Sequence, residues 1–156
     1  MLMADKLPDG VVLGLDIGTV RVGVAASRFD IRLPRPVTTI AFDAASFNDD
    51  VAKLVREHDA RMVVAGWPRG MQGQSTPQTV FVEELVEALR IHLGVAVYLQ
   101  DEALTSQRAE AELQQRRKPY DKEAVDALAA TYILEDFIQS EAYARALEGL
   151  METSDV

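Results

Sequence analysis

Hydrophobic runs at the start of the chain predict several short strands. The continuous apolar run that leads from Val11 to Asp16 is typical of a central strand covered on both faces. Gly18 interrupts this run, and the small, β-rich segment Arg21–Ser27 follows after a few residues, which predicts a hairpin. A third short strand is expected over Pro36–Ile40. The first part of the chain should therefore be antiparallel.

Helical and strand patterns alternate in the rest of the chain. Ser75 and Gln78 match a capping box, and Pro77 suits a first helical turn, so a helix is expected to start there. Pro119 disfavours one continuous helix through the last part of the chain. The predicted elements are a helix containing Phe47 and Val55, a strand over Arg61–Gly66, a helix to about His92, a strand over Val95–Leu99, and helices over Thr105–Arg117 and Asp121–Ser140.

This order of elements predicts an α/β protein. The sheet should be mixed and five-stranded, with antiparallel hairpin strands first and parallel strands later, and it should be flanked by helices. Residues 1–10 are expected to form a flexible leader, residues 11–140 one domain, and residues 141–156 an acidic C-terminal tail. A chain of 156 residues, 48% of them hydrophobic, can bury one sizeable core.

Composition narrows the cellular setting. The chain has no cysteine, which excludes disulfides and thiolate metal ligands and favours the cytoplasm over an oxidising compartment. Its apolar runs are far shorter than the ~20 residues of a membrane helix, so no membrane span is expected. The first ten residues lack the apolar core of a signal peptide.

Charge is unevenly distributed. The net charge of -9 argues against a protein that coats nucleic acid nonspecifically, because phosphate binding requires clustered Lys and Arg. Acidic residues dominate from Glu135 to the end of the chain. Basic residues gather at Arg116, Arg117 and Lys118 and, near the amino terminus, at Arg21, Arg28, Arg32 and Arg35. Such residues can simply form solvated faces. We expect Arg116, Arg117 and Lys118 to lie beside the carboxylates described next and to guide phosphates toward them.

Three carboxylates stand out. Asp16 ends an apolar strand at a glycine-containing turn, where an ionised group must be solvated, paired or bound to a cation. Asp101 and Glu102 follow the last predicted strand, and since side chains alternate along an extended segment, one of them should face a shared site. We select Glu102. Asp126 lies on the apolar stripe of the last predicted helix. Each acid also has a structural interpretation, as a turn cap, as loop polarity or as a complement to a helix dipole in the first turn.

Together, these carboxylates are oxygen ligands of the kind that hard cations prefer. Two Mg²⁺ or Mn²⁺ ions ~3.5–4 Å apart could activate a water and stabilise a departing phosphodiester oxygen. His58 and His92 are predicted near helix ends without metal-ligand spacing, and surface or capping roles suit them better.

Trp67 is the only tryptophan and lies beside a loop rich in glycine and proline. It could stack on an unpaired base, a contact of ~1–3 kcal/mol. Packing against the sheet is the alternative that we favour. Arg21 and Arg69 are also assigned to substrate binding.

Four blocks of the sequence resemble, in order, the motifs of the YqgF (RuvX) family. They are LGLDIGTVRVGVA, GWPRGMQGQSTPQT, LQDEALTSQRAE and VDALAATYILEDFI, and they extend from about Val11 to Phe137. The pattern Asp-x-Gly-x-x-Arg-x-Gly of the first block is met by Asp16, Gly18, Arg21 and Gly23. The family's Gly-x-Pro loop is met by Gly66, Pro68 and Gly73.

The resemblance implies a ribonuclease H-like fold in which Asp16, Glu102 and Asp126 are the catalytic and metal-ligating residues. It implies cleavage of structured nucleic acid, either precursor small-subunit ribosomal RNA or branched DNA such as a Holliday junction, and a homodimer is among the expected partners. Three positions depart from the family pattern and concern substrate contacts more than metal binding. Ala103 replaces an Arg, Gln72 replaces an Asp, and Trp67 replaces a smaller apolar residue.

Two other functional classes are open at this stage. LDIGT also resembles the first phosphate loop of the actin, hexokinase and Hsp70 superfamily, which would make the protein a phosphate- or ATP-binding module. That superfamily repeats the fold in two lobes, whereas this chain is long enough for one. A non-catalytic nucleic-acid-binding module is the other alternative, and the three intact acids argue against it.

Overall fold

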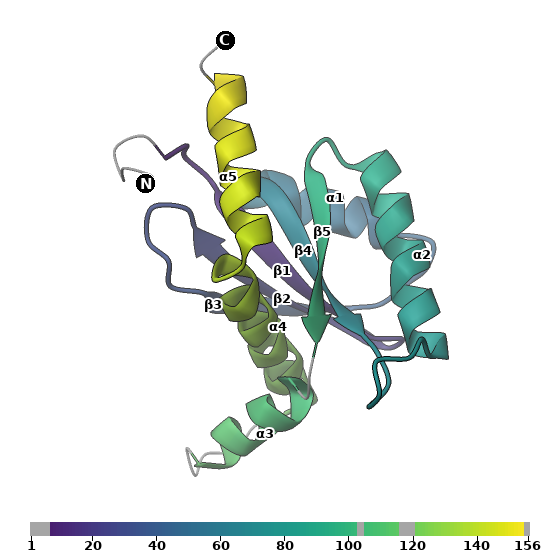
Figure 1. Ribbon diagram of the computed structural model, residues 1–156. Helices are drawn as coiled ribbons and strands as arrows, with labels where there is room; N and C mark the ends of the chain where they lie inside the picture. Colours follow the sequence, from purple (N-terminus) through teal and green to yellow (C-terminus); the bar gives the residue numbers. More distant parts are fainter. Residues whose placement is uncertain (1–6, 103–104, 116–120, 155–156) are drawn as a thin grey trace.

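The computed structural model describes residues 7–102, 105–115 and 121–154 (Figure 1). Within these ranges the chain forms five strands and five helices. In chain order they are β1 (Val11–Ile17), β2 (Arg21–Arg28), β3 (Arg35–Ala41), α1 (Phe47–Glu57), β4 (Ala60–Pro68), α2 (Pro77–His92), β5 (Ala96–Glu102), α3 (Thr105–Gln115), α4 (Lys122–Ile138) and α5 (Glu141–Ser154). None of these helices is both long enough and apolar enough to cross a membrane.

The five strands form one mixed sheet in the order β3-β2-β1-β4-β5. The strands β1, β2 and β3 pair antiparallel, as predicted for the hairpin region. The strands β1, β4 and β5 are parallel to one another, so their carboxyl ends meet at the same edge of the sheet. The predicted α/β class and mixed sheet are confirmed.

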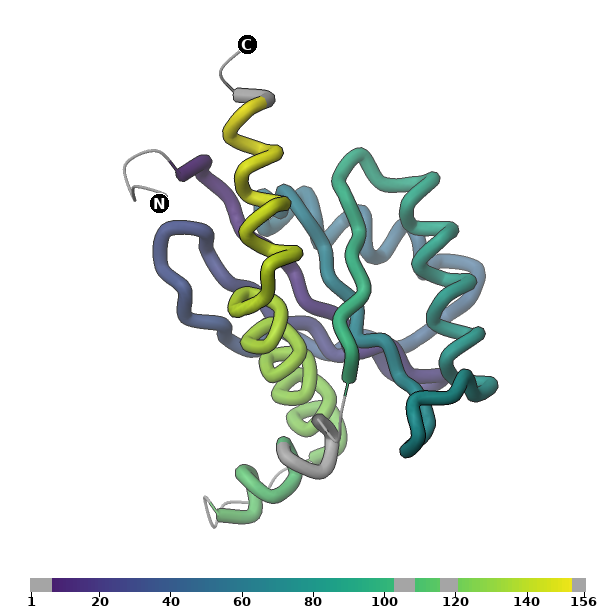
Figure 2. Tube along the Cα trace, viewed as in Figure 1, coloured from purple at the N-terminus to yellow at the C-terminus, as the bar shows by residue number. Residues whose placement is uncertain are grey.

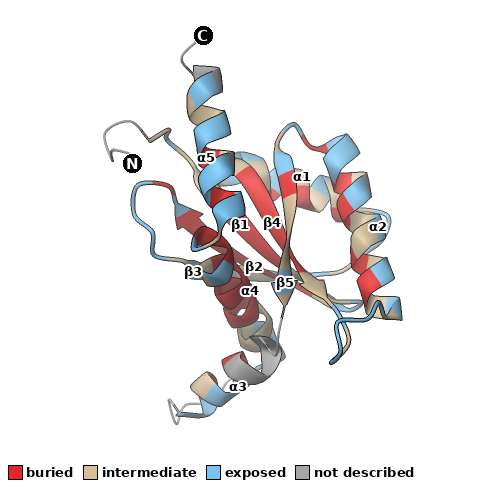
Figure 3. Cartoon of the chain, in the orientation of Figure 1, coloured by how far each residue is buried: buried red, intermediate tan, exposed pale blue. Residues whose placement is uncertain are grey.

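Helices cover both faces of the sheet (Figures 1 and 3). On one face, α1 and α2 bury Phe47, Val51 and Val86 against Leu15 and other odd-numbered positions of β1. On the other face, α4 and α5 pack over the even-numbered positions of the same strand, and α3 packs on α4. Figure 2 shows α3 at the end of the molecule where β5 finishes, and α5 running toward the opposite end.

The cap of α2 lies one residue later than predicted. Thr76 is the N-cap, and its hydroxyl accepts a hydrogen bond from the Thr79 backbone N–H, while the Thr79 hydroxyl accepts one from the Thr76 backbone N–H. The Ser75 and Gln78 prediction was therefore wrong in register, because the pair of threonines closes the box instead. The Gln78 amide instead donates to the Ile17 carbonyl at 3.0 Å and ties the start of α2 to the end of β1.

The segment that we expected to be an acidic tail contains a packed helix. Residues 141–154 form α5, with Tyr143 and Leu147 buried among residues of α4. The Tyr143 ring contacts Phe137 edge-on, with centroids 5.5 Å apart. Acidic residues lie on the outer side of this helix, so a high acidic content concealed two core positions. The boundary at residue 140 stays a prediction, as does the leader, of which residues 1–6 lie outside the described part of the chain.

Candidate active site

The three predicted carboxylates come from elements that meet at one edge of the sheet. Asp16 is the next-to-last residue of β1, and Glu102 is the last residue of β5. Because β1 and β5 run parallel, both acids lie at the carboxyl edge, where ligands bind in open α/β sheets. Asp126 lies on α4, which packs against β1 and β2. The helix begins at Lys122 with Asp121 as its N-cap, so Asp126 is in the second turn and does not cap the first.

Side-chain alternation turns Asp16 and Glu102 toward the face of the sheet that α4 covers. Gly14, two residues before Asp16, lies against Leu134 of α4. Gly66 of β4 lies against Ile133 of α4, and a Cβ placed on it would be 2.8 Å from Glu102 Oε2. Glu102 and Asp16 therefore both face α4. Because Gly14 and Gly66 have no side chains, there is room for this helix and for the Glu102 carboxylate.

Gly23 determines how closely α4 approaches the site. It is the antiparallel partner of Asp16 on β2, and a Cβ on it would overlap the backbone of Asp126 and Ala127. An isolated glycine inside a strand often marks such a close backbone approach. Gly23 is therefore a sequence signal for the contact with α4, and the predictions from sequence missed it. Gly23 thus sets the distance between Asp126 and the sheet.

Replacing Gly23 by Ala should strongly destabilise the protein. The added methyl group meets backbone atoms, which cannot rotate away, so we expect a loss of about 3 kcal/mol or more, or roughly 10 °C in Tm for a chain of this size. Thermal unfolding measures this loss. Gly94→Ala is the matched control, because a Cβ there meets nothing within 4 Å. Similar Tm values for the two variants would contradict the close approach.

Electrostatics couples the three acids. Burial raises the pKa of Asp16 well above its ordinary value, and the negative charges of Glu102 and Asp126 raise it further. A side-chain hydrogen bond with Glu102 acts in the same direction. A partly buried carboxylate with two acidic neighbours is costly without a cation. The site therefore favours binding of a positive charge.

Arg21 already supplies one positive group. Its Nε donates to Asp126 Oδ2 at 2.6 Å, and both side chains are partly buried. The two residues are 105 positions apart in the sequence, so this ion pair links the first hairpin to α4. We had assigned Arg21 to substrate contact, and that role stays a prediction. Its observed contact is with a site carboxylate.

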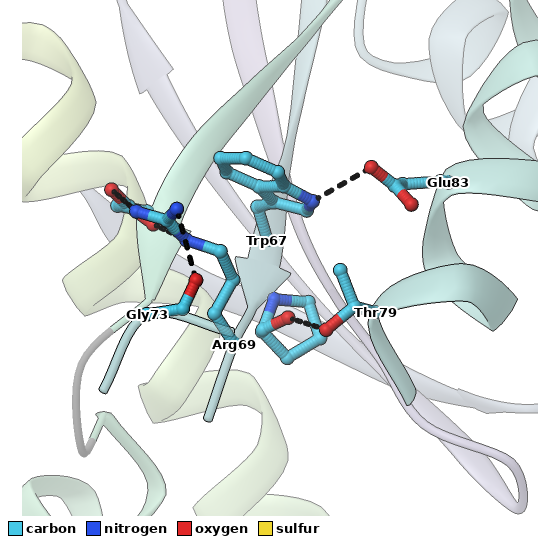
Figure 4. Close-up of polar contacts among 7 residues, drawn as sticks. Trp67, Arg69, Gly73, Thr79 and Glu83 are labelled. Carbon is cyan, nitrogen blue, oxygen red and sulfur yellow. Dashed lines mark hydrogen bonds and ion pairs between the residues drawn. The ribbon is translucent and has the colours of Figure 1, made fainter. Parts of the chain in front are cut away.

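Asp101 and Trp67 face the other side of the sheet. Asp101 accepts hydrogen bonds from Arg69 Nε at 3.0 Å and from Arg69 Nη2 at 2.8 Å. Trp67, its partner in the β4–β5 register, donates from its indole nitrogen to Glu83 of α2 at 3.2 Å. The Arg69 guanidinium lies over the Trp67 ring, 4.3 Å from its centroid (Figure 4). Sequence alone did not predict these pairings.

Other predicted contacts lie outside the described residues. Arg116, Arg117 and Lys118 belong to this group, so their proposed guidance of phosphates stays a prediction. Among the described residues, no three His, Cys, Asp or Glu side chains form a ready cage for a metal ion. The donors gathered around Asp16 are all carboxylate oxygens, which suit Mg²⁺ and Mn²⁺ better than soft metals.

Comparison with known proteins defines the relationship of this chain. A family model described as "RuvX: Holliday junction resolvase" matches residues 10–140. The chain belongs to the RuvX family. A family member from Chloroflexus aggregans, described as "Putative pre-16S rRNA nuclease", is 39% identical over 132 residues, which cover 83% of this chain and 93% of the relative. A protein of the same description from Rippkaea orientalis is 38% identical over 133 residues, 82% and 94% of the two chains.

The fold of this RuvX family member is also found in a solved structure. The structure of RuvC from Thermus thermophilus superposes with a TM-score of 0.51 over 83% of this chain and 95% of that chain, at 16% sequence identity. At this identity the likeness concerns the fold alone. The ribonuclease H-like architecture expected from the sequence is therefore confirmed.

Proposed function

We propose that this protein is a divalent-metal-dependent nuclease that hydrolyses phosphodiester bonds in structured nucleic acid, with precursor small-subunit ribosomal RNA as its substrate. The observation that carries the proposal is the coupled carboxylate cluster at the carboxyl edge of the sheet. Asp16 lies close to Glu102 and Asp126, and its pKa is raised by burial and further by the negative charges of these two neighbours. The relatives' description as pre-16S rRNA nucleases supports the choice of substrate.

Asp16, Glu102 and Asp126 would hold the metal. When bound, Mg²⁺ or Mn²⁺ would lower the pKa of a water so that it becomes a nucleophile at neutral pH, and would neutralise charge on the departing oxygen. The three acids present oxygen donors, as these ions require. Asp126 would divide its carboxylate between the cation and Arg21, which holds Oδ2. Arg21 would therefore orient Asp126, and the partly exposed remainder of its guanidinium would face the phosphate.

The surrounding elements hold the site in place. Gln78 ties the start of α2 to the end of β1, next to Asp16. Gly23 and Gly66 let α4 and the Glu102 carboxylate close over the site. Catalytic groups supported in this way keep the geometry that a positioned nucleophile needs.

A cleavage assay tests the proposal. Purified protein would be incubated with a labelled precursor 16S ribosomal RNA fragment, a duplex RNA of similar length and a four-way DNA junction, each with Mn²⁺, Mg²⁺ or EDTA. We expect cleavage of the precursor RNA that depends on the metal. Cleavage of the junction alone would indicate that the substrate is branched DNA, as the family description suggests. No cleavage of any substrate with either metal would overturn the proposal.

The proposal includes the setting of the enzyme. A precursor ribosomal RNA substrate and a sequence without cysteine both fit the reducing cytoplasm. A homodimer also stays a prediction, and the protein's mass in solution, measured by light scattering, would test it.

A further inference from the structure

The contacts of Arg69 distinguish a stacking surface from a phosphate clamp. Nε and Nη2 of its guanidinium both donate to the Asp101 carboxylate. Nη1 donates to the Gly73 carbonyl at 3.3 Å. Three of the five N–H groups of the guanidinium are thus engaged, and its charge is matched by Asp101. A phosphate would have to displace a bidentate carboxylate to use these donors.

The flat faces of the guanidinium form a second contact surface. One face lies over Trp67, 4.3 Å from the ring centroid. The Arg69 side chain is nevertheless 34% exposed. Trp67 is held in turn by its hydrogen bond to Glu83, as Figure 4 shows. Indole and guanidinium form a layered surface that the protein itself keeps in place, which lowers the entropic cost of stacking.

This surface lies at the same end of the sheet as the carboxylate cluster. Trp67 and Asp101 are partners in the β4–β5 register, and Pro68 and Glu102 are the next pair. Successive residues point to opposite faces, so the acids and the Arg69 surface lie on the two sides of one sheet end. A strand that crosses this end can bring a phosphate to the acids and turn a neighbouring base toward Arg69. A base within a continuous duplex must first leave its stack and its pair, at a cost of roughly a few kcal/mol, before it can turn in this way.

We propose that the Trp67–Arg69 layer, fixed by Asp101, is a stacking site for an unpaired base beside the scissile phosphate, and that it selects nucleic acid with unpaired nucleotides over continuous duplex. This inference rests on the proposed nuclease function and names its substrate class. It also revises the expectation for Trp67. The Trp67 ring packs against one face of the Arg69 guanidinium, and the base would stack on the other face.

Binding to two matched RNAs tests the site. One is a continuous duplex, and the other is the same duplex with one unpaired nucleotide. Trp67 is the only tryptophan, so its fluorescence reports binding at this place. Titrations in EDTA, repeated at several salt concentrations, give affinities without cleavage. We expect wild type to prefer the RNA with the unpaired nucleotide by roughly 5- to 100-fold, the range of one base–aromatic stack.

Arg69→Lys and Arg69→Ala separate stacking from charge. Lys keeps the charge but lacks the planar guanidinium. The proposal expects both variants to lose the preference, with an unchanged slope of log affinity against log salt. A phosphate contact would instead leave the preference largely intact in Arg69→Lys and would lower the slope by ~0.7–0.9 in Arg69→Ala. Either of those two results would overturn the proposal.

Arg56→Ala controls for the loss of any surface charge, since Arg56 lies in the last turn of α1, before the opposite end of β4. It should keep the preference of the wild type. Cleavage of precursor RNA by the Arg69 variants is measured in parallel. Metal-dependent cleavage that persists while the binding preference is unaffected by Arg69 would reject the stacking site and leave the nuclease proposal standing. Absence of cleavage in the wild type would reject the nuclease proposal itself.

Discussion

Asp16→Asn is expected to abolish cleavage and to make the metal-free protein more stable. Loss of one carboxylate from the metal site should remove several kcal/mol of transition-state stabilisation, which corresponds to a ~100- to 10,000-fold lower rate. The amide keeps the shape of the side chain but removes a partly buried charge beside Glu102 and Asp126. Near neutral pH in EDTA, we expect a gain of about 1 kcal/mol or more, or about 2–4 °C in Tm.

The pH dependence of this gain has a definite sign. Because the pKa of Asp16 is raised in the folded state, the folded protein binds a proton more tightly than the unfolded chain. Stability of the metal-free wild type should therefore fall as pH rises from the ordinary carboxyl range through the raised pKa of Asp16. The stability of Asp16→Asn should not show this decrease with rising pH.

Melting temperatures in EDTA at several pH values measure the stability effect. Asp136→Asn is the control, because Asp136 is an exposed acid on α4. It should change neither activity nor the pH profile. Wild-type cleavage rates in Asp16→Asn would remove Asp16 from the mechanism, and a lower Tm at neutral pH would contradict the electrostatic account of its burial.

Glu102→Gln should reproduce the loss of cleavage, whereas Asp101→Asn should be much milder. Glu102 shares a hydrogen bond with Asp16, while Asp101 faces Arg69 on the other side of the sheet. We expect at least a ~100-fold loss for Glu102→Gln, as for another ligand of a metal site. For Asp101→Asn we expect a loss in cleavage rate of about tenfold or less, because this change weakens the hydrogen bonds to Arg69 and leaves the three acids unchanged.

Single-turnover cleavage rates of the two variants give this comparison. Glu87→Gln provides a matched carboxylate-to-amide control on α2, where Glu87 pairs only with the exposed Arg90 among the contacts described. An inactive Asp101→Asn variant together with an active Glu102→Gln variant would mean that the wrong neighbour had been assigned to the metal.

Local patterns in the sequence predicted the sheet and the position of the acids well. The apolar run of β1 predicted that Asp16 lies at a strand end. Alternation along β5 predicted that only one of Asp101 and Glu102 faces the site, because strand geometry imposes a two-residue period. The apolar stripe around Asp126 predicted its orientation toward the sheet for the corresponding helical reason. The assignment of these acids as catalytic and metal-ligating residues stays a prediction.

Long-range pairings could not be predicted in this way. Arg21 meets Asp126 across 105 positions, and Arg69 meets Asp101 across 32. Such contacts depend on strand order, which a single sequence does not encode in any local period. Packing of α5 was missed for a different reason. Its acidic outer face dominated the composition, and Tyr143 and Leu147 gave too short an apolar pattern to predict a buried helix.

Mn²⁺ binding tests most directly whether the three acids form a metal site. Electron paramagnetic resonance of free Mn²⁺ would be followed while wild type, Asp16→Asn, Glu102→Gln, Asp126→Asn and the control Asp136→Asn are added. We predict that wild type and Asp136→Asn deplete the free-ion signal, and that each of the other three variants binds at least about tenfold more weakly, a loss that substitutions outside the ligand set already cause in metal sites. Equal Mn²⁺ affinity in all five proteins would contradict the account.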